Sequence, residues 1–132
     1  MSPAHGSLLR PDSRPSRRRA LASHGCQVIL TVSIPHEEML GAVRRIAEVV
    51  DVPVTADMEA GYGHAPETVA ETVRLTIEAG AVGLNIEDSD AQVTGHPLLD
   101  FDLSVERIHA AAEAVLGGLQ QDFAMAISCV AV

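Results

Sequence analysis

The most constraining feature of this sequence is a short apolar run that ends in two carboxylates and a glycine-rich turn. Residues 52–63 read VPVTADMEAGYG, in which Asp57 and Glu59 come just before the Gly-Tyr-Gly turn. In a β-strand alternate side chains share a face, so these two acids would point the same way, roughly 7 Å apart. Two acids on one face are costly without a positive partner, and a divalent cation is the usual one.

The same plan recurs further along the chain. Residues 81–86 (AVGLNI) form a second apolar run, which ends in Glu87 and Asp88. By the strand period, Asn85 and Glu87 share a face and Asp88 points the other way. A helix-like segment, residues 66–79, separates the two runs. Strand, helix and strand, with acids at both strand ends, predict a parallel α/β enzyme with its site at the carboxyl edge of the sheet.

Helical spacing of apolar residues predicts three helices. The first begins at Pro35 and ends near Val49, because proline suits the first helical position. The second spans residues 66–79, and the third spans residues 105–116 with Ser104 as its N-cap. The faces that we expect to be buried consist of Met39, Leu40, Val43, Ile46, Ala47 and Val50, then Val69, Val73 and Ile77, then Ile108, Ala111, Ala112 and Val115.

Two further strands are expected near the ends of the chain. Residues 123–132 form a last apolar run, and residues 28–32 are a weaker candidate for a short strand. Right-handed crossovers would join these elements into one parallel sheet. The 132 residues suffice for one modest core but not for a complete eight-fold βα barrel, which needs about 200 residues or more.

Charge divides the chain into two parts. Residues 1–33 carry five arginines and one acid (+4), whereas residues 34–132 carry four arginines and seventeen acids (−13), which gives the net charge of −9. We expect the Arg/Pro/Ser-rich residues 1–33 to be a disordered segment, with a targeting peptide or a shifted start as alternatives, and residues 34–132 to be the folded domain. The acidic domain argues against a nucleic-acid partner.

Two other partner and compartment expectations follow from the sequence. No apolar run reaches membrane-spanning length, so we expect no membrane partner. Cys26 and Cys129 lack metal-ligand spacing, which indicates free thiols in a reducing compartment and a cytoplasmic protein.

The predicted sheet would bring Asp57, Glu59 and Glu87 to one edge. Three oxygen ligands with added waters suit Mg2+ or Mn2+ rather than zinc, because no Cys or His joins them. Such an ion can hold a 2-oxo acid and stabilise the enolate that forms when a bond next to the carbonyl breaks. Acids at strand ends also serve as helix caps or ion-pair partners, and this alternative stays open. His64 could bind substrate, act as a base or be a passive loop residue.

The exact residues add a family resemblance. VPVTADMEAGYG, PETVAETV and EAGAVGLNIEDS together closely resemble the isocitrate lyase/phosphoenolpyruvate mutase superfamily, from about Glu38 to Arg107. The likeness is nearest to the small phosphonomutase-like members, with 2-methylisocitrate lyase as a neighbour. It implies a partial (β/α)8 TIM barrel, a Mg2+ site, and chemistry at a C–C or P–C bond of a 2-oxo acid or related carboxylate through an enolate-like intermediate.

The resemblance also implies roles for individual residues. Three acids match the metal-site positions of the family, the Gly-Tyr-Gly turn matches the loop beside them, and one strand residue adds a polar substrate contact. The predicted metal ligands are Asp57, Glu59 and Glu87, and the predicted substrate-binding residues are Gly61, Tyr62, Gly63 and Asn85. No catalytic acid or base is assigned.

The chain departs from the family pattern at three places. Family lyases carry a KKCGH-type loop after the strand that ends like Glu87, whereas this loop reads SDAQVTGHPLLD, without Cys or Lys. Glu59 stands where the mutases and methylisocitrate lyases usually have Asp. The arginine of an NARTD-like motif is missing from the last run, AMAISCVAV.

Two hypotheses follow. The first is a Mg2+-dependent, homo-oligomeric enzyme with a small-molecule carboxylate substrate. The second is a truncated, non-catalytic member that keeps the metal-site sequence. For the isolated chain we expect self-association through open sheet edges, and no lyase activity on 2-methylisocitrate or isocitrate.

Overall fold

Strands and helices alternate along the chain in the computed structural model, which describes residues 26–28, 34–89, 95, 97–118 and 123–128. The strands are β1 (Cys26–Val28), β2 (Val54–Asp57), β3 (Gly83–Glu87) and β4 (Ala124–Ser128). The helices are α1 (His36–Val49), α2 (Pro66–Glu78) and α3 (Phe101–Gly117). The described part of the chain is therefore an α/β structure, as the sequence predicts.

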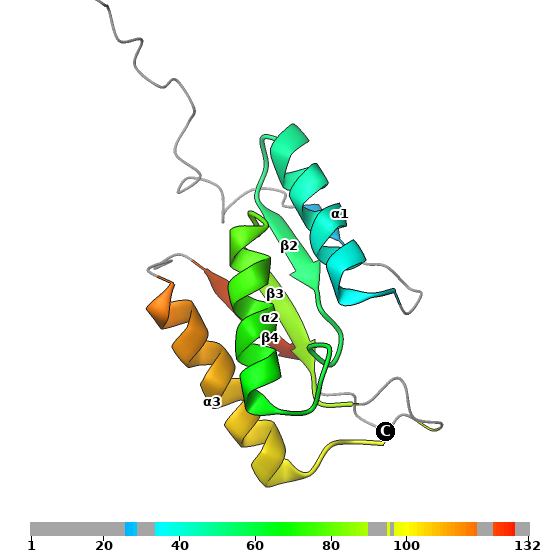
Figure 1. Ribbon diagram of the computed structural model, residues 1–132, viewed down its shortest axis with the longest axis vertical. Coiled ribbons are helices and arrows are strands. Elements are labelled where there is room, and N and C mark those ends of the chain that lie inside the picture. The colour runs from blue at the N-terminus through cyan, green and yellow to red at the C-terminus, as the bar shows by residue number, and fades with distance from the viewer. Residues whose placement is uncertain (1–25, 29–33, 90–94, 96, 119–122, 129–132) are drawn as a thin grey trace, which may run out of the picture.

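The strands form one parallel sheet in the order β1-β2-β3-β4. Asp57 at the end of β2 is the Cα partner of Asn85 on β3, and Glu87 at the end of β3 is the partner of Ser128 on β4. The three helices lie along one face of this sheet (Figure 1). The predicted adjacency of the two acid-ending strands is confirmed, and their carboxyl ends lie at the same edge.

The core lies between the helices and the sheet. Along β2 the buried residues Val54 and Ala56 alternate with the half-buried Thr55 and Asp57. Since successive strand residues face opposite ways, one face of β2 is apolar and packs under the helices, and the other face is polar. The apolar face of the two central strands consists of Val54, Ala56, Leu84 and Ile86, all 3% exposed or less.

Helix α1 buries most of the face that its spacing predicts, with Ile46 and Val50 only partly buried. Met39, Leu40, Val43 and Ala47 are buried, and acidic residues in the first turn suit the positive end of the helix dipole. Pro35 is the N-cap of this helix rather than its first residue.

Helix α2 begins at Pro66, as expected, but its buried face is rotated relative to the prediction. Val69, Thr72, Val73 and Thr76 are buried, whereas Ile77 is only partly buried. The two threonines can be buried because their hydroxyl groups donate hydrogen bonds, from Thr72 to the Gly61 carbonyl (2.9 Å) and from Thr76 to the Thr72 carbonyl (2.7 Å).

The predicted start of the third helix is wrong. Helix α3 begins at Phe101, and its N-cap is Asp100 rather than Ser104. The Asp100 carboxylate accepts hydrogen bonds from the backbone N–H groups of Asp102 (3.0 Å) and Leu103 (3.3 Å). Aspartate caps a helix as well as serine does, so the earlier residue takes the role. The buried residues of α3 are Arg107 and Ala111, with Ile108 and Val115 partly buried.

The outer strands differ from their predicted ranges. β1 lies within residues 1–33 and overlaps the candidate strand 28–32 only at Val28. β4 occupies the first half of the expected run 123–132. The expected disorder of residues 1–25 falls outside the described residues. Among the helices that the structure describes, none is long and apolar enough to cross a membrane.

Candidate functional site

Three of the predicted site residues lie on the polar face of the sheet at its carboxyl edge. Asp57 and Asn85 are side by side in the register of β2 and β3, and Glu87 follows two residues along β3. This spacing places all three on the same face, opposite the helices. The edge therefore presents two carboxylates and an amide, as the sequence predicts.

Glu59 reaches the same edge by a different route from the one predicted. β2 ends at Asp57, and Glu59 lies in the following turn with a left-handed backbone (φ 49°). Its backbone N–H donates to Asp57 Oδ1 (3.1 Å), and its carbonyl accepts from the Glu87 N–H (2.7 Å). These two hydrogen bonds, and not the strand period, join Glu59 to the ends of β2 and β3.

The ionisation of Glu59 is affected by burial and by the two other acids of this edge. Burial raises the pKa of Glu59, and the nearby Asp57 and Glu87 carboxylates raise this pKa further. Like charges at this edge disfavour the ionised form of Glu59. A cation bound here would relieve that repulsion.

The donor chemistry of this edge fits a hard divalent cation. Carboxylate oxygens are the ligands that Mg2+ prefers, and Mg2+ usually keeps several waters and takes only one or two protein carboxylates. Within the described residues, however, no three His, Cys, Asp or Glu side chains converge closely enough to hold an ion directly. The assignment of Asp57, Glu59 and Glu87 as metal ligands stays a prediction.

The predicted substrate loop lies directly beside the acids. Tyr62 adopts a left-handed backbone (φ 62°), and its ring stacks on that of His36, with centroids 4.4 Å apart and planes 18° apart. Burial raises the pKa of Tyr62, and the Glu59 and Asp57 carboxylates add to this rise. The Tyr62 hydroxyl group therefore stays protonated at neutral pH and can donate a hydrogen bond.

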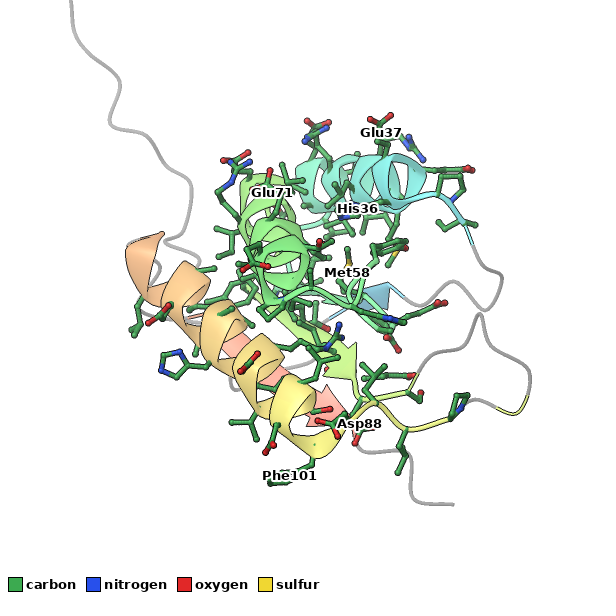
Figure 2. All side chains as sticks on the ribbon, turned by 60° about the horizontal axis from the view of Figure 1, so that its bottom comes forward. His36, Glu37, Met58, Glu71, Asp88 and Phe101 are labelled. Atoms are coloured by element: carbon green, nitrogen blue, oxygen red, sulfur yellow. The ribbon has the colours of Figure 1, made fainter. Side chains whose placement is uncertain are left out.

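His36 is a neighbour of the site that sequence analysis missed. In Figure 2 it points from the start of α1 toward Met58, whereas Glu37 points away. Burial lowers the pKa of His36, against the opposing effect of the Glu37 and Glu71 carboxylates. The Nε2 atom of His36 is buried without a hydrogen-bond partner. A histidine at a helix start gives no sequence signal for a stack with a residue 26 positions later.

Three further polar residues that sequence analysis missed hold the edge in place. Arg107 is 1% exposed and donates to the carbonyls of Gly63 and Ala60. Thr72 donates to the Gly61 carbonyl, and the Ser89 hydroxyl donates to Glu87 Oε2 (3.2 Å). One signal for Arg107 was present: it lies one helical turn before Ala111, on the buried row of the helix.

The remaining predictions near the site have separate outcomes. His64 is exposed, and its role stays a prediction. Ser89 and Leu98 form an isolated antiparallel bridge, and the Leu99 N–H donates to the Asp88 carbonyl (2.8 Å). Residues 90–94 and 96 of the loop SDAQVTGHPLLD fall outside the described residues.

A parallel sheet in sequential strand order, with its helices on one face and acids at the carboxyl ends of its strands, is the arrangement of βα units in a (β/α)8 barrel. A profile of the phosphoenolpyruvate phosphomutase family matches residues 22–123. The chain belongs to this family, and the predicted superfamily is confirmed.

Sequence and structure comparisons agree with this assignment. The chain is 37% identical to 2-methylisocitrate lyase of Escherichia coli (strain K12) over 83 residues, which are 59% of this chain and 28% of that protein. A proposed phosphonomutase from Burkholderia cenocepacia J2315 superposes with a TM-score of 0.67 at 41% identity, over 73% of this chain and 38% of that one. Phosphoenolpyruvate phosphomutase from Streptomyces platensis subsp. rosaceus gives a TM-score of 0.61 at 30% identity, over 73% and 34%.

The share of each relative that this chain covers shows that the chain corresponds to part of those proteins. The chain spans less than a third of the length of the Escherichia coli relative and between a third and two fifths of the two solved structures. The fold is accordingly part of a (β/α)8 barrel, as the resemblance implies.

Proposed function

We propose that this protein is a Mg2+-dependent (or Mn2+-dependent) member of its family that acts at a C–C or P–C bond of a 2-oxo acid or related carboxylate. The observation that carries the proposal is the position of Asp57, Glu59 and Glu87. The first and last end neighbouring parallel strands, and hydrogen bonds join Glu59 to both. Acids at the carboxyl edge of βα units are placed where barrel enzymes have their sites.

Asp57, Glu59 and Glu87 would hold the cation, directly or through waters. When bound, the ion would polarise the carboxylate and keto oxygens of the substrate and stabilise the negative charge that develops when the neighbouring bond breaks. Burial and the Asp57 and Glu87 carboxylates raise the pKa of Glu59, and a cation at this position would offset that effect by stabilising the ionised form.

The loop after β2 would contribute the substrate contacts. The Tyr62 hydroxyl group, kept protonated by burial and by the nearby acids, would donate a hydrogen bond to a substrate oxygen. Gly61 and Gly63 would contribute by letting this loop pack against Val69 and Thr68 of α2, since an added Cβ at either position would lie within 3.2 Å of those side chains. Asn85, beside Asp57 on the polar face, would offer an amide to the same ligand.

The binding step is tested with Mn2+ and oxalate. Oxalate presents two oxygens on adjacent carbons, as a 2-oxo acid or its enolate does, and it cannot react further. We expect the full chain to bind oxalate only when Mn2+ is present, measured by calorimetry, and we expect Asp57→Asn to abolish this binding. Oxalate binding that is the same with and without Mn2+ contradicts the proposal.

Turnover separates the two hypotheses for the chain. The full chain with Mg2+ is incubated with oxaloacetate or phosphonopyruvate, and the products are followed by NMR. Turnover that Asp57→Asn abolishes supports the enzyme. Mn2+-dependent oxalate binding without any turnover favours the non-catalytic member. For 2-methylisocitrate and isocitrate we expect no turnover, because the loop after Glu87 has neither Cys nor Lys.

A further inference from the structure

The turn that follows β2 has an unusual backbone. Glu59 (φ 49°), Gly61 (φ 76°) and Tyr62 (φ 62°) are all left-handed, and two of these residues are not glycine. A non-glycine residue in this region costs about 1–2 kcal/mol and persists only where the surrounding structure enforces it. Some contact outside the turn must therefore stabilise its conformation.

Those contacts come from two buried side chains on two different helices. From α3, Arg107 Nη1 donates to the Gly63 carbonyl (2.5 Å) and Nη2 donates to the Ala60 carbonyl (2.6 Å). From α2, Thr72 Oγ1 donates to the Gly61 carbonyl between them (2.9 Å). Arg107 is 1% exposed and Thr72 is fully buried, so both donor side chains are shielded from water.

Two carbonyls that accept hydrogen bonds from one buried side chain require an arginine rather than an apolar residue at position 107. A guanidinium group is planar and carries several N–H donors in a fixed fork, so it can hold two carbonyls at a set separation. A buried charge is costly, and an apolar side chain would fill the same space without that cost. The two hydrogen bonds to the turn are what an apolar residue could not supply.

We propose that Arg107, assisted by Thr72, is a positioning residue that clamps the turn Ala60–Gly63 and thereby sets the places of Glu59 and Tyr62 at the site. This inference rests on the proposed function, because it assigns the clamp to the predicted metal and substrate site. Arg107 extends from α3 and contacts the turn at its backbone carbonyls. It would therefore act on the ligand only indirectly, through the positions of Glu59 and Tyr62.

The chain offers a spectroscopic probe for this clamp. Tyr62 is the one tyrosine of the sequence and there is no tryptophan, so tyrosine emission reports on this turn alone. Tyr62 is half-buried and stacked on His36. Release of the turn should expose the ring and raise its quenching by acrylamide toward the value measured in denaturant.

The experiment compares Arg107→Met, Arg107→Lys and Thr72→Val with Arg74→Met as the control. Arg74 is an exposed arginine of α2 whose ion pairs with Glu71 and Glu78 stay on the helix surface. Each full-length variant is checked for folding by circular dichroism. Acrylamide quenching of Tyr62 is then measured without metal, and Mn2+ affinity is measured by calorimetry.

We expect Arg107→Met to raise the quenching of Tyr62 and to weaken Mn2+ binding about 10-fold to 100-fold, as removal of a group that orients a ligand typically does. Arg107→Lys, which can still donate to one carbonyl, should recover part of both effects. Thr72→Val keeps the shape and removes one hydrogen bond, so it should give a smaller change in the same direction. Arg74→Met should match the wild type in both measurements.

Folded Arg107→Lys and Thr72→Val variants with wild-type quenching and wild-type Mn2+ affinity overturn the clamp, even if Arg107→Met does not fold. The two readouts also separate this inference from the proposed function. A wild-type chain that binds no Mn2+ contradicts the proposed function, whereas the quenching of Tyr62 still decides whether Arg107 and Thr72 hold the turn.

Discussion

Two neighbouring strands end in carboxylates at the same edge of the sheet, but the chain continues differently after each. After β2 it turns sharply through Gly61, and buried side chains of two helices, α2 and α3, hold the carbonyls of the turn. After β3, the described residues are held by backbone pairing within residues 88–99, through the Ser89–Leu98 bridge and the hydrogen bond from the Leu99 N–H to the Asp88 carbonyl, and Leu98 is 51% exposed.

The same sequence feature, an acid at the end of a strand, is therefore held in place by different contacts in the two regions. Glu87 is positioned by its place in β3 and by the hydroxyl group of Ser89. Glu59 is positioned by a strained turn that depends on contacts up to 47 residues away in the sequence. The position of Glu59 should therefore respond to substitutions far from the site, and that of Glu87 mainly to substitutions within the sheet.

The largest difference between the two regions should appear in a pair of glycine substitutions. Gly61 (φ 76°) is buried, and an added Cβ would lie 3.2 Å from Val69, whereas Gly95 (φ 90°) would meet nothing within 4 Å. Both alanine variants carry left-handed strain, but only Gly61→Ala adds crowding. We expect losses of about 2–3 kcal/mol for Gly61→Ala and about 1 kcal/mol for Gly95→Ala in the free energy of unfolding, measured with urea. Equal losses would mean that the turn after β2 is no more constrained than the segment after β3.

A smaller effect should distinguish two buried threonines of α2. Thr72 donates to the Gly61 carbonyl of the turn, whereas Thr76 donates to the Thr72 carbonyl within its own helix. Thr72→Val leaves a turn carbonyl without this donor and should cost about 1 kcal/mol of stability. Thr76→Val should be nearly neutral, since the Thr72 carbonyl still accepts the backbone hydrogen bond of helix α2 when the Thr76 hydroxyl group is removed. Thermal unfolding of the two variants measures this difference, and a larger loss for Thr76→Val would contradict it.

The smallest effect concerns pH and the stack on Tyr62. Because burial holds the pKa of His36 below its ordinary value of 6.5, the folded protein favours the neutral imidazole. The resulting stability is present above pH 6.5 and is lost as the pH falls through the lowered pKa. His36→Asn should flatten the dependence of the unfolding temperature on pH in this range. A wild-type profile in the His36 variant would exclude His36 as a source of the pH dependence.

Local patterns explain why much of the fold could be predicted. The strand and helix periods placed α1, α2, β2 and β3 to within two residues, because these elements have clear apolar faces. The start of α3 was missed, since Asp100 and Ser104 are both N-cap residue types and Phe101, 77% exposed, lies off the apolar row.

The edge of the sheet was predictable only in part. Asp57, Asn85 and Glu87 follow from strand ends and the period of two. The conformation of the turn that contains Glu59 and Tyr62 does not follow from these patterns, because non-glycine residues seldom adopt positive φ. Arg107 and Thr72 were missed because their partners lie 44, 47 and 11 residues away, and no local pattern encodes such contacts.

The most direct test of the metal assignment is a calorimetric titration of Mn2+ into the wild type, Asp57→Ala and Asp88→Ala. Asp57 lies on the polar face with Asn85 and Glu87, whereas Asp88 follows Glu87 and belongs to the opposite face by the strand period. We predict weak binding to the wild type, no binding to Asp57→Ala, and a much smaller loss for Asp88→Ala. Equal losses in the two variants, or undiminished binding to Asp57→Ala, would contradict the account.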